Sequence, residues 1–332
     1  MPFEIQVDAL DPYSYYRLMS IRRAVALPAL LTVGATVLLV GCPVEDRARA
    51  FAQFQYQWTR NWPLARGRNL PARLSTILRV TGIAPPVQVE VEPGIVMRLN
   101  PGDIVDRRIL ATGRWSDGVW KLIEAHLEDD SVLIDVGAHI GSMTLRAAKR
   151  VSSGTVVAVE PNPITARRLR ENIAASGAEN VHVEEKACGR EHGTLDLYAG
   201  PSANSGATSF SKSLVMEHSS DGETKFTVEV VPLDEIVEAL GLSRVDVVKI
   251  DTEGAEVQVL RGALETLERF RPVLVLETID GHMKNLGDSL EVLEKILTEA
   301  GYVQVDQAEQ DTKWISKRAG SRTEMGKTEN SL

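Results

Sequence analysis

The sequence contains very little cysteine. Cys42 and Cys188 are the only two among 332 residues, and they lie far apart in unlike surroundings. Two isolated cysteines exclude a disulfide framework and a zinc site built on cysteine, because either needs several cysteines at short spacings. The low cysteine content fits a reducing compartment.

Long basic runs are also missing. The chain has 37 lysine and arginine residues against 46 aspartate and glutamate residues, which gives a formal net charge of −9. Proteins that bind nucleic acid contact its phosphates through a basic face. The sequence therefore argues against a nucleic-acid partner.

Charged residues are absent from one long segment near the N-terminus. Residues 24–41 read AVALPALLTVGATVLLVG and follow a leader, residues 1–23, that ends in Arg22 and Arg23. A helix of this length spans about 27 Å, close to the roughly 30 Å hydrocarbon core of a bilayer. We expect an apolar helix that spans the membrane. An apolar helix that is buried in protein or lies at the membrane interface, and a cleaved export signal ending in LVGC, are the alternatives.

The segments beyond this helix divide into a linker, a folded domain and a tail. Residues 42–85 are rich in arginine and aromatic residues, which suits either a solvated helical linker or a surface beside the membrane. Residues 86–316 alternate between predicted strands and helices, which is typical of a folded domain. Residues 317–332 are polar and contain glycine, so we expect a disordered tail.

Strands and helices alternate through residues 86–316. The stretch VQVEVEPGIVMRL has the alternation and Pro-Gly turn of a hairpin, and SDGVWKLIEAHLEDD reads as an amphipathic helix. The later strands are predicted at Val132–Val136, Thr155–Glu160, Val181–Lys186, Val245–Asp251 and Pro272–Glu277, and the later helices at Ser142–Arg150, Pro163–Ser176, Ala255–Phe270 and Ser289–Ala300. Aliphatic strands alternating with helices imply an α/β fold with a doubly wound, parallel sheet.

A glycine-containing turn follows the first of these strands in VLIDVGAHIGSMTL. Asp135 ends the strand, and Gly137 and Gly141 lie in the turn before the next helix. Glycines at this spacing indicate that something approaches the backbone closely, and the free N–H groups of the helix start face it. The spacing differs from the G-x-G-x-x-G turn that holds a pyrophosphate. An aspartate stands where a cationic group of a ligand could pair with it.

An acidic residue also ends the next strand, in VVAVEPNP. Glu160 follows Asp135 by twenty-five residues, where a carboxylate can accept both hydroxyl groups of a ribose. A nucleoside with a cationic amino-acid arm matches both features. The cofactor indicated is S-adenosylmethionine.

The region from about Asp103 to Gln304 resembles the FkbM family of S-adenosylmethionine-dependent methyltransferases. The segments that carry the resemblance are IDVGAHIGSMTL, VVAVEPNP, VVPLDEI, DVVKIDTEGAEVQVLRG and PVLVLE. It implies a Rossmann-like class I methyltransferase fold with a mostly parallel seven-stranded sheet, and methylation of a hydroxyl oxygen. His139 departs from the family, which more often has asparagine there. The expected cofactor-binding residues are Asp135, Gly137, Ala138, His139, Gly141, Glu160, Pro161, Asn162, Ala187 and Asp251.

The segment KIDTEGAEVQVLRG carries the expected chemistry. Asp251 would contact the cofactor or the acceptor, and Glu253 would orient the acceptor or act as a base. Glu256 is the third expected catalytic carboxylate, although it also suits a helix N-terminus. Carboxylates that converge at one edge of a sheet repel each other unless a cation or shared protons relieve them. The sulfonium of the cofactor can be part of that relief, and we predict no metal, with a divalent metal as the alternative.

Histidine is the side chain best suited to remove the hydroxyl proton near neutral pH. His139, beside the glycine turn, and His282, five residues beyond Glu277, are the two candidates, although a lone histidine is more often a hydrogen-bonding wall residue. We include His282 among the expected catalytic residues.

The acceptor cannot be read from the sequence beyond its general class. The long Ser- and Gly-rich stretch Gly200–Thr224 is expected to form a lid over a small-molecule, glycan or lipid-linked acceptor. A membrane-associated interaction protein that binds the cofactor without transferring its methyl group is the alternative function. Because S-adenosylmethionine is made inside cells, we expect a membrane-anchored chain with its catalytic domain in the cytoplasm; a soluble cytoplasmic protein is the alternative.

Overall fold

The structure is a computed structural model that describes residues 86–199, 205–206, 208–210 and 225–317. The predicted apolar helix at 24–41, the linker at 42–85 and all but the first residue of the predicted tail lie outside these ranges. Within them, no helix has both the length and the apolar character needed to cross a membrane. The domain boundaries stay predictions.

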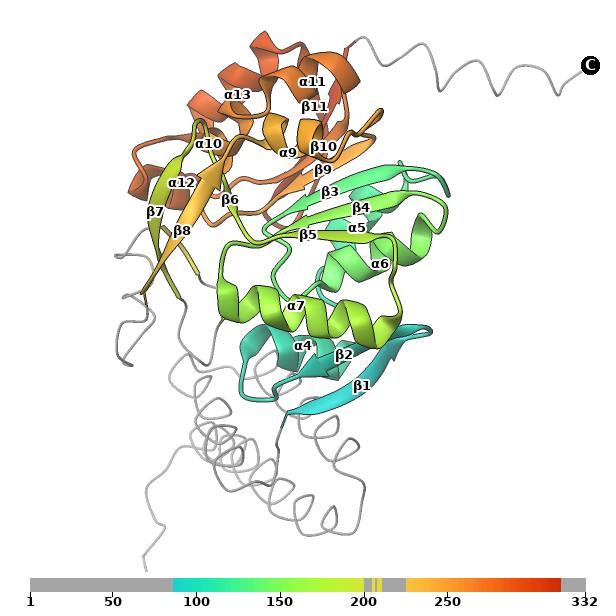
Figure 1. Cartoon of the computed structure of the whole chain (residues 1–332). Helices are drawn as coiled ribbons and strands as arrows, with labels where there is room; N and C mark the ends of the chain where they lie inside the picture. The colour runs from blue at the N-terminus through green and yellow to red at the C-terminus, as the bar shows by residue number, and fades with distance from the viewer. Residues whose placement is uncertain (1–85, 200–204, 207, 211–224, 318–332) are drawn as a thin grey trace, which may run out of the picture.

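A seven-stranded sheet forms the centre of the molecule, with the strand order β11-β12-β10-β9-β3-β4-β5 (Figure 1). Its strands are β3 (Val132–Val136), β4 (Thr155–Val159), β5 (Val181–Glu184), β9 (Val247–Ile250), β10 (Val273–Glu277), β11 (Tyr302–Ala308) and β12 (Asp311–Ser316). The five strands from β10 to β5 are parallel, whereas β11 and β12 form an antiparallel hairpin that pairs with β10. The predicted Rossmann-like α/β fold is confirmed.

Helices cover both faces of this sheet (Figure 1). On one face α5 (Asp117–Glu124) and α6 (Ser142–Arg150) pack on Leu133, Val247 and Val275, and α7 (Pro163–Ser176) packs beside them. The other face is covered by α9 (Leu233–Ala239), α10 (Glu256–Arg261), α11 (Leu264–Phe270) and α13 (Leu290–Glu299). Burial of the strands on both faces explains why they read as continuous aliphatic runs.

One predicted helix is wrong. The segment Ala255–Phe270 forms two helices, α10 and α11, which are separated at Gly262 and Ala263. A Cβ atom on Gly262 would lie 2.0 Å from the carbonyl oxygen of Gly189, so this glycine permits close contact with a distant segment. Helical periodicity alone does not reveal such a contact.

Smaller elements complete the domain. The predicted hairpin is present as β1 (Val87–Glu92) and β2 (Ile95–Leu99), followed by α4 (Ile104–Thr112). It is held on α7 because the N–H of Arg98 donates to Asn172 Oδ1 at 2.7 Å. A separate three-stranded sheet consists of β6 (Ala187–Cys188), β7 (Gly193–Tyr198) and β8 (Lys225–Val231), and α12 (Asp280–Asn285) follows β10.

Candidate functional site

A cavity lies at the carboxyl ends of the parallel strands. The turn after β3, the residues after β4 and β9, the end of β10 and the β11–β12 turn all line it. Eight of the predicted site residues are in its wall: Gly137, Ala138, His139, Glu160, Pro161, Ala187, Asp251 and Glu253. Asp135, Gly141, Asn162, Glu256 and His282 are not in that wall.

The glycines of the turn after β3 are required by contacts within the protein. Gly137 has φ +80°, and a Cβ atom there would lie 1.8 Å from the carbonyl oxygen of Asp251. Gly141 has φ +93°, and its Cβ atom would lie 2.7 Å from Leu169 Cδ1. Within the protein, the groups that approach these glycines are therefore Asp251 and Leu169, and the approach of a ligand to this turn stays a prediction.

Glu160 retains free acceptor sites that face the cavity. Its carboxylate accepts the N–H of His139 on Oε2 and the N–H of Asn162 on Oε1, each at 2.9 Å. A carboxylate oxygen has two acceptor positions, so one on each oxygen remains. Burial raises the pKa of Glu160 to about 7, against the lowering effect of the two N–H groups.

Asn162 acts as a helix cap. Its side chain accepts the N–H groups of Ile164 and Thr165, and Pro163 occupies the first turn of α7. This arrangement is typical of a helix start. The side chain of Asn162 is therefore turned toward α7, although its N–H orients Glu160.

A buried lysine joins two of the predicted carboxylates. Lys249 Nζ lies 3.4 Å from Asp135 Oδ1 and 3.2 Å from Asp251 Oδ2, and we call these three residues the lysine cluster. Thr144 donates a hydrogen bond to Asp135 Oδ2 at 2.6 Å. Burial lowers the pKa of Lys249, but the charges of Asp251, Asp135 and Asp311 outweigh it and leave that pKa raised. The lysine stays protonated and holds both aspartates in place.

The carboxylate of Glu256 supports the turn that carries Glu253. Glu256 Oε1 accepts the N–H of Thr252 at 2.9 Å and the N–H of Gly254 at 3.1 Å, and its side chain is buried. Glu253 has φ +54°, a left-handed conformation that such bracing keeps in place. We expected a catalytic carboxylate at Glu256, whereas the structure gives it a positioning role.

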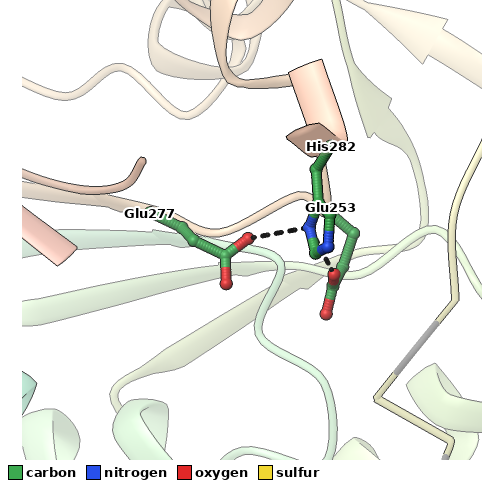
Figure 2. A group of neighbouring side chains, drawn as sticks. All are labelled: Glu253, Glu277 and His282. Carbon is green, nitrogen blue, oxygen red and sulfur yellow. Dashed lines mark ion pairs between the residues drawn. The ribbon is translucent and has the colours of Figure 1, made fainter. Parts of the chain in front are cut away.

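His282 lies beside two carboxylates, as Figure 2 shows. Its Nδ1 atom is 3.1 Å from Glu253 Oε2 and 3.8 Å from Glu277 Oε2. We call Glu253, Glu277 and His282 the histidine cluster. The neighbouring carboxylates of Glu253 and Glu277 raise the pKa of His282 to about 10, while burial and the charge of Asp251 raise the pKa of Glu277 to about 9.

Neither histidine has a pKa suited to taking a proton at neutral pH. Burial lowers the pKa of His139 to about 4, although the charge of Asp103 opposes it. His139 is therefore neutral, and His282 already holds a proton. A histidine base stays a prediction that these pKa directions argue against, and Asp251 and Glu253 are two of the carboxylates in the cavity wall.

Residues 205–206 and 208–210 connect several parts of the site. The N–H of Ser205 donates to Asp103 Oδ2 at 2.7 Å, and Ser205 Oγ lies 3.0 Å from His139 Nε2. Ser209 Oγ donates to the carbonyl oxygen of Glu253 at 3.2 Å. Gly206, Thr208 and Phe210 are in the cavity wall. The rest of the predicted lid lies outside the described residues.

Five charged residues of the cavity wall received no role from the sequence, and Lys249, Glu277 and Asp311 are three of them. Lys249 was visible in KIDTEGAE, and Glu277 ends a strand at the same edge as Asp135 and Glu160. The rule that placed those two residues would also have found Glu277. Asp311 is harder to predict, because it reaches the cavity through the antiparallel pairing of β12, where it lies opposite Glu277.

The family profile and the relatives with known names all point to methyltransferases. The sequence profile of the methyltransferase FkbM domain matches residues 135–303. Hexuronic acid methyltransferase AglP of Haloferax volcanii is 30% identical over 201 residues, which cover 60% of this chain and 77% of that protein. The 2-O-methyltransferase NoeI of Sinorhizobium fredii is 28% identical over 152 residues, which cover 43% of this chain and 61% of that protein.

One solved structure aligns with part of the chain. Methyltransferase FkbM from Methylobacillus flagellatus KT aligns with a TM-score of 0.42 at 15% identity, covering 78% of this chain and 60% of that chain. The profile match covers half of the chain, and the aligned part of AglP is more than two thirds of that protein. The chain belongs to the FkbM methyltransferase family.

Proposed function

We propose that this protein is an S-adenosylmethionine-dependent methyltransferase that acts on a hydroxyl oxygen of a small-molecule, glycan or lipid-linked acceptor. The observation that carries the proposal is the cavity at the carboxyl edge of the sheet, where the turn after β3, Glu160 and the two carboxylates Asp251 and Glu253 meet. This is the edge at which doubly wound sheets bind their ligands.

The residues of the cavity fit the cofactor. Glu160 has unused acceptor positions for ribose hydroxyl groups, and the turn from Gly137 to His139 presents backbone to the cavity. Asp135 Oδ1 is buried and has no hydrogen-bond partner, although Lys249 lies 3.4 Å from it. A cationic ligand group near Asp251 would complete this set of charges.

In this reaction the protein supplies the group that accepts the hydroxyl proton and the residues that position that group. The cofactor would provide a methyl group on a positively charged sulfur. An acceptor hydroxyl oxygen forms the new bond to carbon, while the electron pair of the broken C–S bond stays on sulfur. The hydroxyl proton passes to Asp251 or Glu253, which must hold the oxygen about 3–3.5 Å from the methyl group. Lys249, Glu256 and His282 position these carboxylates.

Two relatives support a hydroxyl-bearing acceptor. AglP is named as a hexuronic acid methyltransferase, and NoeI is named as a 2-O-methyltransferase. A sugar or another polyhydroxylated molecule is therefore the acceptor class that we favour.

The experiment is methyl transfer from labelled S-adenosylmethionine to hexuronic-acid glycans and to fractionated cell extract. Asp251→Asn should lower turnover at least tenfold without changing the melting temperature, because it keeps the shape and removes the charge. Asp306→Asn changes an exposed aspartate on β11 and is the control. Equal turnover by the Asp251 variant and wild type would make that carboxylate purely structural.

We also propose that residues 24–41 anchor the chain to a membrane with the catalytic domain in the cytoplasm, because they form an unbroken charge-free run. The full-length protein should then sediment with membranes, resist a high-salt wash and be released by detergent. Recovery in the soluble fraction without detergent would refute the anchor.

A further inference from the structure

Acidic side chains outnumber lysines in the cavity wall. Six of its residues are carboxylic acids and two are lysines; the acids are Glu160, Asp251, Glu253, Glu277, Glu309 and Asp311, and the bases are Lys186 and Lys249. Lys249 is engaged by Asp135 and Asp251, so it does not serve the histidine cluster. Lys186 lies 3.9 Å from Glu184. Within the histidine cluster, two carboxylates share one histidine.

Three potential metal ligands converge at that point from separate elements. One atom each of Glu253, Glu277 and His282 lies within 4.8 Å of the other two. They come from the turn after β9, the end of β10 and helix α12. Neighbouring ligands of one ion are roughly 3 Å apart when their bonds are about 2.1 Å long. The 3.1 Å and 3.8 Å separations from His282 Nδ1 therefore need only a small adjustment.

Two of these donor atoms have no hydrogen-bond partner. Glu277 Oε2 and His282 Nδ1 are both shielded from solvent, and neither makes a hydrogen bond. The side chain of Glu277 is 13% exposed. Buried polar atoms normally make hydrogen bonds, whereas these two have only ion-pair contacts, Nδ1 at 3.1 Å from Glu253 Oε2 and at 3.8 Å from Glu277 Oε2, so a bound ligand would supply the partner that they lack.

The backbone around the cluster is fixed. A Cβ atom on Gly254 would lie 2.6 Å from the carbonyl oxygen of His282, so the turn after β9 and the start of α12 are in close contact. Glu256 braces the same turn through the N–H groups of Thr252 and Gly254. Ligands on rigid supports hold an ion without a large loss of conformational entropy.

We propose that Glu253, Glu277 and His282 bind a divalent cation that anchors the acceptor. Two carboxylate oxygens and one imidazole nitrogen suit a cation of the Mn²⁺ type, with Mg²⁺ and Zn²⁺ as chemically related occupants. Three protein ligands leave coordination positions free, which two adjacent acceptor oxygens of a sugar diol or a hydroxy acid can fill. Glu253 is then a ligand, and Asp251 is the carboxylate that takes the hydroxyl proton. The anchoring role rests on the proposed function, whereas cation binding does not.

The direct test is Mn²⁺ binding to the chelator-treated, full-length protein, measured by the electron paramagnetic resonance signal of free Mn²⁺. We expect one site per chain, and Glu277→Gln and His282→Ala should each weaken it at least tenfold. The control is His192→Ala, because His192 pairs with Glu235 at 2.5 Å on the surface without a second carboxylate. Melting temperatures of all variants show whether they fold.

A separate titration of S-adenosylmethionine by calorimetry tells the two proposals apart. Cofactor affinity should change less than twofold between chelator-treated and Mn²⁺-loaded protein, because Glu160, the residue proposed to hold the ribose, is not one of the ligands. Cofactor binding without any binding of Mn²⁺, Mg²⁺ or Zn²⁺ would overturn the cation site and leave the methyltransferase proposal intact. Mn²⁺ binding that both variants retain would also overturn this assignment.

Discussion

Two groups of charged residues lie at the same edge of the sheet. They differ in how the negative charge of their carboxylates is compensated. In the lysine cluster, Lys249 sits between Asp135 and Asp251, so opposite charges meet within the protein. In the histidine cluster, one histidine faces two carboxylates and leaves two buried atoms without a hydrogen bond. The first group has its counter-charge built in. The second requires protons or a ligand, which is why we assign the cation to it.

Gly137→Ala should break the lysine cluster most completely. Its new Cβ atom would collide with the carbonyl oxygen of Asp251, 1.8 Å away, and the residue has φ +80°. We expect a loss of about 4 kcal/mol or more in the free energy of unfolding, measured by chemical denaturation. Gly177→Ala is the matched control, since Gly177 has φ +62° but no atom within 4 Å. Similar losses for the two variants would contradict the contact.

Lys249→Met should turn the lysine cluster into a second unbalanced acidic group. Asp135 is almost fully buried, and removing its cation leaves it without a counter-charge. We expect a loss of about 3 kcal/mol in the free energy of unfolding, smaller at acid pH because the carboxyls can then be protonated. Lys225→Met removes an exposed ion pair with Asp196 and should change stability little. An equally mild effect of both variants would show that Lys249 is dispensable.

His139→Asn should have the smallest effect of the three substitutions. It tests the turn after β3 separately from the lysine cluster and the histidine cluster. Burial depresses the pKa of His139 from 6.5 to about 4, so its contribution to stability is present above pH 6.5 and is lost as the pH falls toward 4. Asparagine tolerates the φ of +52° at this position and does not titrate. We expect unchanged melting at pH 7.5 and a higher melting temperature than wild type at pH 5. The same pH dependence in both proteins would be evidence against a buried, neutral histidine.

Local sequence signals predicted the strands and several helices closely. Helix α7 begins and ends where we expected, because Asn162 and Pro163 mark its start and Gly177 its end. Acidic residues at strand ends located Asp135, Glu160 and Asp251, since a parallel sheet brings its carboxyl ends to one edge. These features depend on neighbours in the chain or on the topology of the sheet.

What the sequence did not show depends on contacts between distant segments. The break at Gly262 follows from the approach of Gly189, and Asp311 enters the cavity only because β12 runs antiparallel to β10. The contacts of Glu256 and His282 could not be predicted either, and their catalytic roles stay predictions. Their side chains face backbone N–H groups and carboxylates of the site, and spacing along the chain does not reveal that orientation.

Calorimetric titration of S-adenosylmethionine into wild-type protein and Glu160→Gln tests the central claim most directly. We predict saturable binding with micromolar-scale affinity to the wild type. The variant keeps the side-chain shape but loses its charged acceptor, which should weaken binding by roughly 1.5–3 kcal/mol, or about tenfold or more. Equal melting temperatures would show that both proteins are folded. No binding to the wild type, or equal affinity for the two proteins, would contradict the assignment of this cavity to the cofactor.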